Sequence, residues 1–320
     1  MSSYQAIRRA IRQGGAALLA AAVVVSVPTF SKAESAVSSA QLSPAPAAVN
    51  PAPNTLAGKV IDKAQAIAHS ATDIFNRVPC RAPKRGLKAI GALPHVASKL
   101  AQGKPVLIVA FGSSSTQGHG VSSPQYNYPN RLAAQLRRHY PKASINIVNA
   151  GVGGEDAPEM MARLQTSVLD LHPDMVIWQV GTNAVLRNLD LKETTDLVES
   201  GIRQIKADGA DLVLIDPQYS PAVNAKAESA SKIVRMLGRI AELRHVGMFP
   251  RFEIMREWHE DQALAFDTFV IADGLHLNDW GYACFAQLLG DNIIKTVGEI
   301  KATANSQETA LPETALHRPM

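Results

Sequence analysis

The feature that most constrains the fold is an alternation of short apolar runs with longer segments of helical periodicity. The first apolar run, Val106 to Gly112 (VLIVAFG), has no polar residue, which is typical of a strand buried on both faces. Strands that alternate with helices pair in parallel, because each helix returns the chain to the same end of the sheet. We therefore predict an α/β protein, a three-layer α/β/α sandwich with a parallel sheet.

The same alternation continues to residue 300 and sets the expected order of elements. Further strands are predicted at Ile145–Asn149, Met175–Val180, Leu212–Ile215 and Gly247–Phe252. Helices are predicted at Tyr128–Tyr140, Ala157–Leu171, Glu193–Asp208, Ala225–Leu243 and Asp279–Ile300, with one more at Lys59–Asn76 ahead of the first strand.

Polar, glycine-rich segments follow the predicted strands. In an open parallel sheet, the loops beyond the carboxyl ends of the strands meet where ligands bind. The segments are Gly112-Ser113-Ser114-Ser115-Thr116, Asn149-Ala150-Gly151-Val152-Gly153-Gly154, Gly181-Thr182-Asn183 and, before the last helix, Asp273-Gly274-Leu275-His276-Leu277-Asn278. Each alone is also compatible with a helix cap or a tight turn, so their joint occurrence carries the inference.

Together and in this order, the four segments resemble the four sequence blocks of the SGNH (GDSL-like) hydrolase family. The resemblance spans Pro105 to Ile300, nearly the whole predicted globular domain. It implies a flavodoxin-like topology and a serine esterase that forms an acyl-serine intermediate. It implies neither a cofactor nor a metal.

The resemblance places the nucleophile at Ser114 and its activating pair at His276 and Asp273. A serine hydroxyl is a weak nucleophile unless a base removes its proton, and a neutral imidazole does so near pH 7. Asp273 precedes His276 by three residues and can reach the other ring nitrogen if the segment turns once. Both activating groups are therefore expected on one loop.

Attack on an ester carbonyl places negative charge on its oxygen, and N–H donors must meet that charge. By the resemblance, these donors are the backbone N–H groups of Ser114 and Gly154 and the side-chain amide of Asn183. Two residues depart from the family pattern, because Ser113 and Ala184 stand where relatives commonly carry aspartate. Ser113 removes no member of the triad, whereas Ala184 bears on the hydrogen bonding around the site and on the substrate range.

Motifs of competing functions are missing or incomplete. The sequence has no Gly-x-Ser-x-Gly elbow and no Gly-Lys-Ser/Thr phosphate loop. The turn at residues 151–154 mimics a dinucleotide fingerprint, but Asp156 occupies the position of its final glycine. His119, between two glycines, either lines the pocket or is a solvated loop residue. No His/Cys cluster in the sequence indicates a metal site.

The amino terminus has the order of a secretory signal peptide. Three arginines between residues 8 and 12 precede the apolar run Gly14–Val27, and the small-x-small site Ser31-Lys32-Ala33 follows. The apolar run has 14 residues, fewer than the roughly 20 that span a bilayer. Cleavage is therefore favoured over a membrane anchor, and we expect a periplasmic or secreted protein. The Arg8-Arg9 pair is a weak twin-arginine feature.

The expected organisation follows from composition. It comprises a signal peptide (1–33), a flexible linker rich in Ala, Pro and Ser (34–58), a helical N-terminal extension (59–104), the hydrolase domain (105–300) and a flexible tail (301–320). The formal net charge is +4, and the signal segment carries four basic and no acidic residues, so the remainder is neutral. A neutral body has no field that gathers nucleic acid.

Cys80 and Cys284 are the two cysteines of the chain. In an oxidising compartment they either pair, stapling the extension to the domain, or remain separate thiols. The sequence leaves both alternatives open.

The expected function is that of an exported esterase that removes small acyl groups, such as acetyl, from carbohydrate or envelope glycans. The alternatives are a lysophospholipase, thioesterase or arylesterase of the same fold, an acyltransferase, or a non-catalytic glycan-binding protein. The expected partner is an acylated small molecule or glycan, not nucleic acid. The sequence leaves the oligomeric state open.

Overall fold

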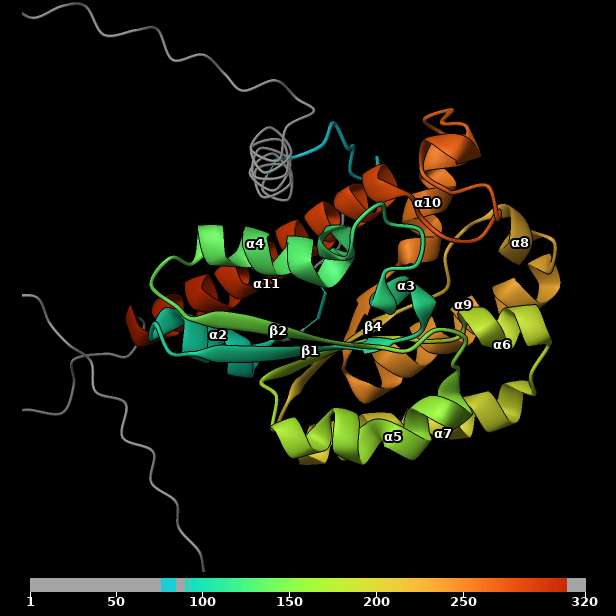
Figure 1. Ribbon diagram of the computed structural model, residues 1–320. Coiled ribbons are helices and arrows are strands. Elements are labelled where there is room, and N and C mark those ends of the chain that lie inside the picture. The colour runs from blue at the N-terminus through green and yellow to red at the C-terminus, as the bar shows by residue number, and fades with distance from the viewer. Residues whose placement is uncertain (1–75, 85–89, 92, 310–320) are drawn as a thin grey trace, which may run out of the picture. The chain divides into compact units, whose positions relative to one another are not determined.

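The structure is a computed structural model that describes residues 76–84, 90–91 and 93–309 (Figure 1). The predicted signal peptide, the linker and residues 59–75 of the first predicted helix lie outside the described residues, as does the tail from residue 310. The predicted division into domains remains a prediction.

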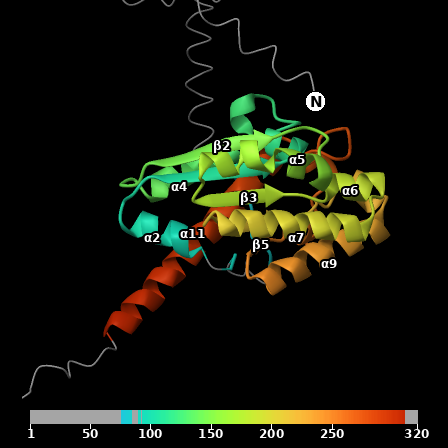
Figure 2. The same ribbon diagram turned by 90° about the horizontal axis from the view of Figure 1, so that it is seen from below.

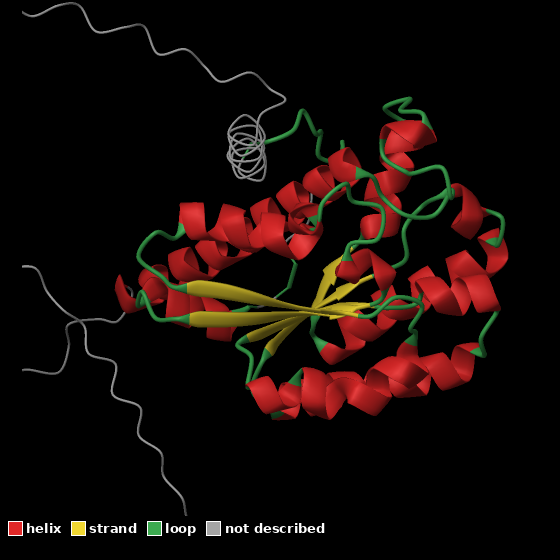
Figure 3. Ribbon diagram, viewed as in Figure 1, coloured by secondary structure: helices red, strands yellow, loops and turns green. Residues whose placement is uncertain are grey.

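The centre of the fold is a five-stranded sheet in the order β2-β1-β3-β4-β5. All neighbouring strands pair in parallel (Figure 3). This order is that of flavodoxin-like sheets, so the predicted fold class and topology are confirmed. The strands are β1 (Val106–Gly112), β2 (Ile145–Gly151), β3 (Met175–Gln179), β4 (Asp211–Ile215) and β5 (Gly247–Phe249).

Helices cover both faces of the sheet (Figures 1 and 2). One face carries α2 (Pro94–Ala101), α4 (Tyr128–His139), α10 (Arg251–Glu260) and α11 (Asp279–Thr309), and the other carries α5 (Ala157–Ser167), α7 (Leu191–Ala207) and α9 (Ala227–Arg244). Three short helices, α3 (Ser114–Gln117), α6 (Thr182–Arg187) and α8 (Pro221–Asn224), lie at the carboxyl end of the sheet.

The two helical layers are held by alternate side chains of the strands. In β1, Ile108 and Ala110 belong to the apolar core beneath α4 and α11, whereas Val109 and Phe111 belong to the core beneath α5 and α7. Successive side chains of a strand point to opposite faces. A continuous apolar run is therefore what a strand between two helical layers requires.

The structure differs from the prediction around the last strand. The predicted strand Gly247–Phe252 is wrong at its end, because β5 stops at Phe249 and α10 begins at Arg251. Pro250 has no N–H to donate to a sheet, so the strand cannot continue past it.

Residues before Pro105 take part in the core. Leu93, Val96 and Leu100, from α2 and its cap, are buried in the same apolar cluster as the inward side chains of β1. The packed core of the described residues therefore begins ahead of the first strand.

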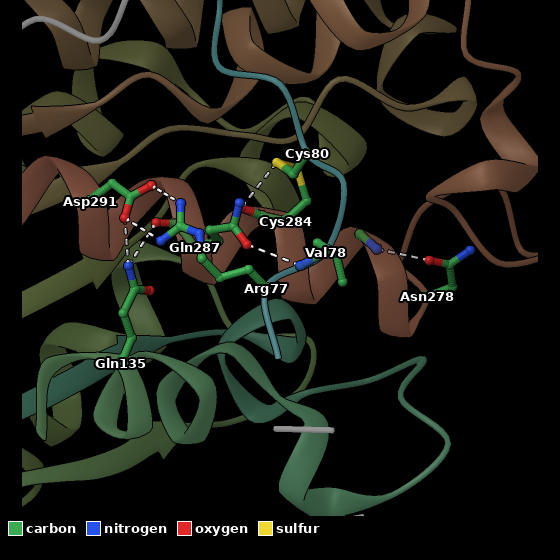
Figure 4. The surroundings of a disulfide bond; sticks show 9 residues. Arg77, Val78, Cys80, Gln135, Asn278, Cys284, Gln287 and Asp291 are labelled. Atoms are coloured by element: carbon green, nitrogen blue, oxygen red, sulfur yellow. Dashed lines mark hydrogen bonds and ion pairs between the residues drawn. A yellow bond between two sulfur atoms is a disulfide. The ribbon is translucent and has the colours of Figure 1, made fainter. Parts of the chain in front are cut away.

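A disulfide joins Cys80 to Cys284 in α11, with 5.4 Å between their Cα atoms (Figure 4). Beside it, the backbone N–H of Val78 donates to Oε1 of Gln287 at 3.1 Å. Of the two alternatives for the cysteines, the structure contains the paired one. The bond ties the segment before the domain to its last helix.

Candidate active site

Ser114 lies at the turn from β1 into α3. Ser113 is extended (φ −97°, ψ −150°) and buried, and its N–H and its hydroxyl both donate to Oε1 of Gln179 at 3.0 Å. Helix α3 begins at Ser114, and the first N–H groups of a helix have no partner within it. The turn thus presents the side chain and the backbone N–H of Ser114 at the carboxyl end of the sheet.

The structure brings the predicted nucleophile and its predicted activating pair together. The hydroxyl oxygen of Ser114 lies 2.8 Å from Nε2 of His276. Nδ1 of His276 lies 2.6 Å from Oδ2 of Asp273. An imidazole with an aspartate on one nitrogen and a serine hydroxyl on the other has the geometry of a general base.

The loop that carries Asp273 and His276 is fixed by its own backbone. Oδ1 of Asp273 accepts the N–H groups of Leu275, at 2.8 Å, and of His276, at 3.0 Å. The carbonyl oxygen of Leu275 accepts from Nε2 of Gln218 at 3.3 Å. The carboxylate therefore closes the turn with one oxygen and keeps the other for the imidazole.

The pKa values of both groups favour the resting state of a base. Burial lowers the pKa of His276, the hydrogen bond and charge of Asp273 act to raise it, and the net pKa is lowered. Burial acts to raise the pKa of Asp273, but the side chain and N–H of His276 and the N–H of Leu275 outweigh burial and lower it. At neutral pH the imidazole is thus neutral and the carboxylate is ionised.

The glycine-rich turn after β2 lies beside the nucleophile. A Cβ placed on Gly153 would lie 4.0 Å from Cβ of Ser114. The side-chain amide of Asn183, in α6, donates to the carbonyl oxygen of Glu155 at 2.7 Å. An amide nitrogen carries two hydrogens, so this bond leaves one for a ligand. The segments of the three predicted oxyanion donors therefore converge at one place.

Arg187 at the end of α6 holds the same turn. Its guanidinium donates to the carbonyl oxygen of Gly154 and, at 3.3 Å, to Oε1 of Glu159. Glu159 in turn accepts the N–H of Asp156, which caps α5. Through these bonds, the carbonyl group of Gly154 is connected to α6 and α5.

The two departures from the family pattern have local explanations. The hydroxyl of Ser113 is buried and donates a hydrogen bond to Gln179. Ala184 is fully buried in the apolar core beneath α7 and α9.

His119 lies over the predicted base. Its ring centroid is 4.3 Å from that of His276, and its Nε2 is 4.0 Å from Oδ2 of Asp273. Its side chain is 57% exposed. Both alternatives for this residue thus hold in part, since His119 is solvated and also contacts the site.

Sequence reasoning missed the residues that support the site. Arg251 is buried and donates to Oε1 of Gln218 at 2.8 Å and to the carbonyl oxygen of Asp216 at 3.0 Å. Gln218 then holds the loop of His276. Arg187 supports the glycine-rich turn in the same way. Arg251 lay inside the predicted strand Gly247–Phe252, so no sequence signal marked it, and Arg187 lies beyond the segment Gly181-Thr182-Asn183 that was singled out.

Comparisons with known proteins identify related sequences. The sequence profile of the Non-GDSL lipase-like family matches residues 79–299. An arylesterase from Vibrio mimicus is 24% identical over 189 residues, which cover 59% of this chain and 88% of the relative. An uncharacterized lipoprotein from Bacillus subtilis (strain 168) is 33% identical over 76 residues, 24% of this chain and 31% of the relative.

Solved structures share the fold. A two-domain esterase active on acetylated mannans superposes with a TM-score of 0.57 at 22% identity, over 66% of this chain. This chain spans 55% of the length of that esterase. A catalytic mutant of an acetylxylan esterase from Geobacillus stearothermophilus superposes with a TM-score of 0.52 at 19% identity, over 59% of this chain and 94% of the other.

Within the described ranges, no helix is long and apolar enough to cross a bilayer. The chain belongs to the Non-GDSL lipase-like family and is a carboxylic ester hydrolase with the GDSL-like fold.

Proposed function

We propose that the chain is an exported serine esterase in which Ser114 is the nucleophile, His276 the general base and Asp273 the residue that orients and stabilises the imidazole. The observation that carries the proposal is the continuous line of contacts from Ser114 through His276 to Asp273, at 2.8 and 2.6 Å. The lowered pKa of His276 supports it, because only a neutral imidazole can take the serine proton.

The reaction proceeds in two halves. Nε2 of His276 accepts the proton of Ser114 as its oxygen attacks the ester carbonyl, and the imidazolium then protonates the departing alcohol. The acyl group remains on Ser114. A water molecule that gives its proton to His276 attacks the acyl-serine, and the carboxylic acid leaves as the serine is reprotonated.

The oxyanion is held by the N–H groups of Ser114 and Gly154 and by the amide of Asn183. The start of α3 at Ser114 supports the first donor, and the second hydrogen of the Asn183 amide supports the third. Arg187 is a positioning residue that supports the second, since it fixes the peptide after Gly154. Loss of one such donor costs about a hundredfold or more in turnover.

The substrate class we propose is carbohydrate bearing small acyl groups, such as acetyl, in the periplasm or outside the cell. Structural neighbours described as active on acetylated mannans or as acetylxylan esterases support the acyl group and the carbohydrate. The disulfide of Cys80 and Cys284 supports an oxidising compartment. The arylesterase relative favours one alternative, namely the hydrolysis of aryl esters.

The experiment measures hydrolysis of p-nitrophenyl acetate, butyrate and octanoate, and acetate release from acetylated xylan and mannan. Wild type is compared with Ser114→Ala and with Ser113→Ala as the matched control. Activity lost in Ser114→Ala but kept in Ser113→Ala, with acetate preferred and acetyl-glycans cleaved, is the expected result. Activity on p-nitrophenyl acetate without acetate release from glycans would favour the arylesterase, and activity kept in Ser114→Ala would overturn the mechanism.

A further inference from the structure

The loop after α3 and the loop before α11 bring three metal-binding side chains together at the edge of the site. His119, Asp273 and His276 each offer a ligand atom, and these atoms all lie within 4.8 Å of one another. Two imidazole nitrogens and one carboxylate oxygen are a ligand set that zinc accepts, with a fourth position for water. We propose that these residues bind a zinc ion and that the bound ion inhibits the esterase, an inference that rests on the proposed function.

The backbone holds His119 in place for this role. Its N–H donates to the carbonyl oxygen of Ser114 at 2.9 Å, and its carbonyl oxygen accepts from the hydroxyl of Tyr282 at 2.8 Å. Gly120 has a positive φ of 96°, and a Cβ there would lie 2.4 Å from the carbonyl oxygen of Leu277. Only glycine allows the two loops to approach this closely.

The carboxylate presents to the two rings the one oxygen that accepts no backbone N–H. Oδ1 of Asp273 is occupied by two backbone N–H groups, so Oδ2 is the ligand atom. It lies 2.6 Å from Nδ1 of His276 and 4.0 Å from Nε2 of His119. Zinc bonds of about 2.0–2.1 Å in a tetrahedron separate two ligand atoms by roughly 3.3 Å. A small rotation of the exposed His119 side chain shortens the 4.0 Å separation. When zinc takes Nδ1 of His276, it replaces the hydrogen bond to Oδ2, and that pair widens from 2.6 Å.

Zinc at this site stops the reaction whichever nitrogen of His276 it takes. If zinc binds Nε2, it occupies the lone pair that accepts the serine proton. If it binds Nδ1, the ring proton moves to Nε2, which then donates and cannot accept. In both cases Ser114 keeps its proton and no acyl-serine forms.

We expect the cation to be one of intermediate hardness, such as zinc, which accepts nitrogen ligands. Mg²⁺ and Ca²⁺ prefer oxygen ligands, and this set offers a single carboxylate oxygen beside two nitrogens. Co²⁺ in place of zinc reports the coordination, because four-coordinate Co²⁺ absorbs visible light more strongly than the hydrated ion.

Binding is measured directly, by calorimetric titration of zinc into Ser114→Ala, which keeps all three ligands and does not need to turn over. One zinc per chain is expected, and His119→Asn should weaken binding about tenfold or more. His172→Asn is the matched control, since His172 is an exposed histidine whose Nδ1 lies 3.4 Å from Oδ1 of Asp208. Absence of zinc binding, or equal binding by His119→Asn, overturns the proposal.

Inhibition is measured on wild type, His119→Asn and His172→Asn, each relative to its own rate in metal-free buffer. Wild type and His172→Asn should lose activity in zinc and regain it with a chelator, whereas His119→Asn should need about tenfold more zinc or above. If wild type hydrolyses no ester, the proposed function fails while the calorimetry still decides the zinc site. If wild type is active and zinc leaves its rate unchanged, only the zinc proposal fails.

Discussion

Nε2 of His276 lies 2.8 Å from the hydroxyl oxygen of Ser114, although the two residues are 162 positions apart in the chain. The contact exists because both loops emerge at the carboxyl end of one parallel sheet. Because the nucleophile and the base are so far apart in the sequence, their contact depends on the whole fold.

Replacing Asp273 by asparagine should cut kcat on p-nitrophenyl acetate by about a hundredfold or more, because the amide no longer fixes the tautomer or stabilises the imidazolium. The variant should keep its fold, since its remaining oxygen can still accept the N–H groups of Leu275 and His276. The matched control is Asp267→Asn, outside the triad. Equal rates for Asp273→Asn and wild type would contradict the role of Asp273.

The pH profile should reflect the lowered pKa of His276. Burial lowers it, Asp273 raises it, and the charges of His119 and Arg251 lower it further. A base with a lowered pKa stays neutral to lower pH, so the acid limb of kcat/KM should have its midpoint below pH 6.5, the usual pKa of histidine. A profile of kcat/KM in metal-free buffers checks this. An acid limb centred above 6.5 would show that burial does not control the base.

Removal of Arg187 should slow turnover while leaving KM little changed. The carbonyl group of Gly154 loses its hydrogen bond to Arg187, so the N–H of Gly154 no longer meets the oxyanion in a fixed place. We expect Arg187→Ala to lower kcat about tenfold or more and to weaken binding of a boronate transition-state analogue. Arg187→Lys should recover part of the loss, because lysine reaches one acceptor but lacks the planar fork.

The control for Arg187 is Arg203→Ala on α7, whose guanidinium lies 3.7 Å from Glu199. It removes an exposed cation of the same kind and should leave kcat and analogue binding at the wild-type values. A loss of kcat shared by both variants would assign the effect to surface charge instead of to the position of Gly154.

The disulfide should stabilise the domain. It links residues 204 positions apart, and a cross-link that closes a long loop restricts the unfolded chain. Cys80→Ala should lower the free energy of unfolding by about 2–5 kcal/mol. Urea unfolding with and without reductant checks this, and reductant should shift the midpoint of wild type but not of the variant. Identical midpoints for all four conditions would leave the bond without a stabilising role.

Local patterns were enough to predict the layers of the fold. The apolar run of β1 and the helical periodicity of α7 and α9 each reflect which side faces the core, and such patterns are visible in a short window. The end of β5 was mispredicted because the apolar Phe252 was included in the strand, although Pro250 and Arg251 interrupt the apolar run. The spacing of Ile254, Met255 and Trp258 on α10 was the signal that should have ended the strand earlier.

The centre of the site was predictable for a different reason. Ser114, Asp273 and His276 stand in short segments whose order carries the resemblance, and the turn around Asp273 is local. The supports were not predictable, because Arg187 meets Gly154, and Gln218 meets Leu275, only after the chain has folded. The contact of the His119 ring with that of His276 likewise depends on two loops from opposite ends of the domain.

Covalent labelling tests directly whether Ser114 is the nucleophile. Wild type is treated with a fluorophosphonate, which reacts with activated serines, and the modified peptide is identified by mass spectrometry. We expect a single modification on Ser114, lost in Ser114→Ala and slowed in Asp273→Asn. Modification of Ser113, Ser115 or another residue, or the same labelling rate in Asp273→Asn, would contradict it.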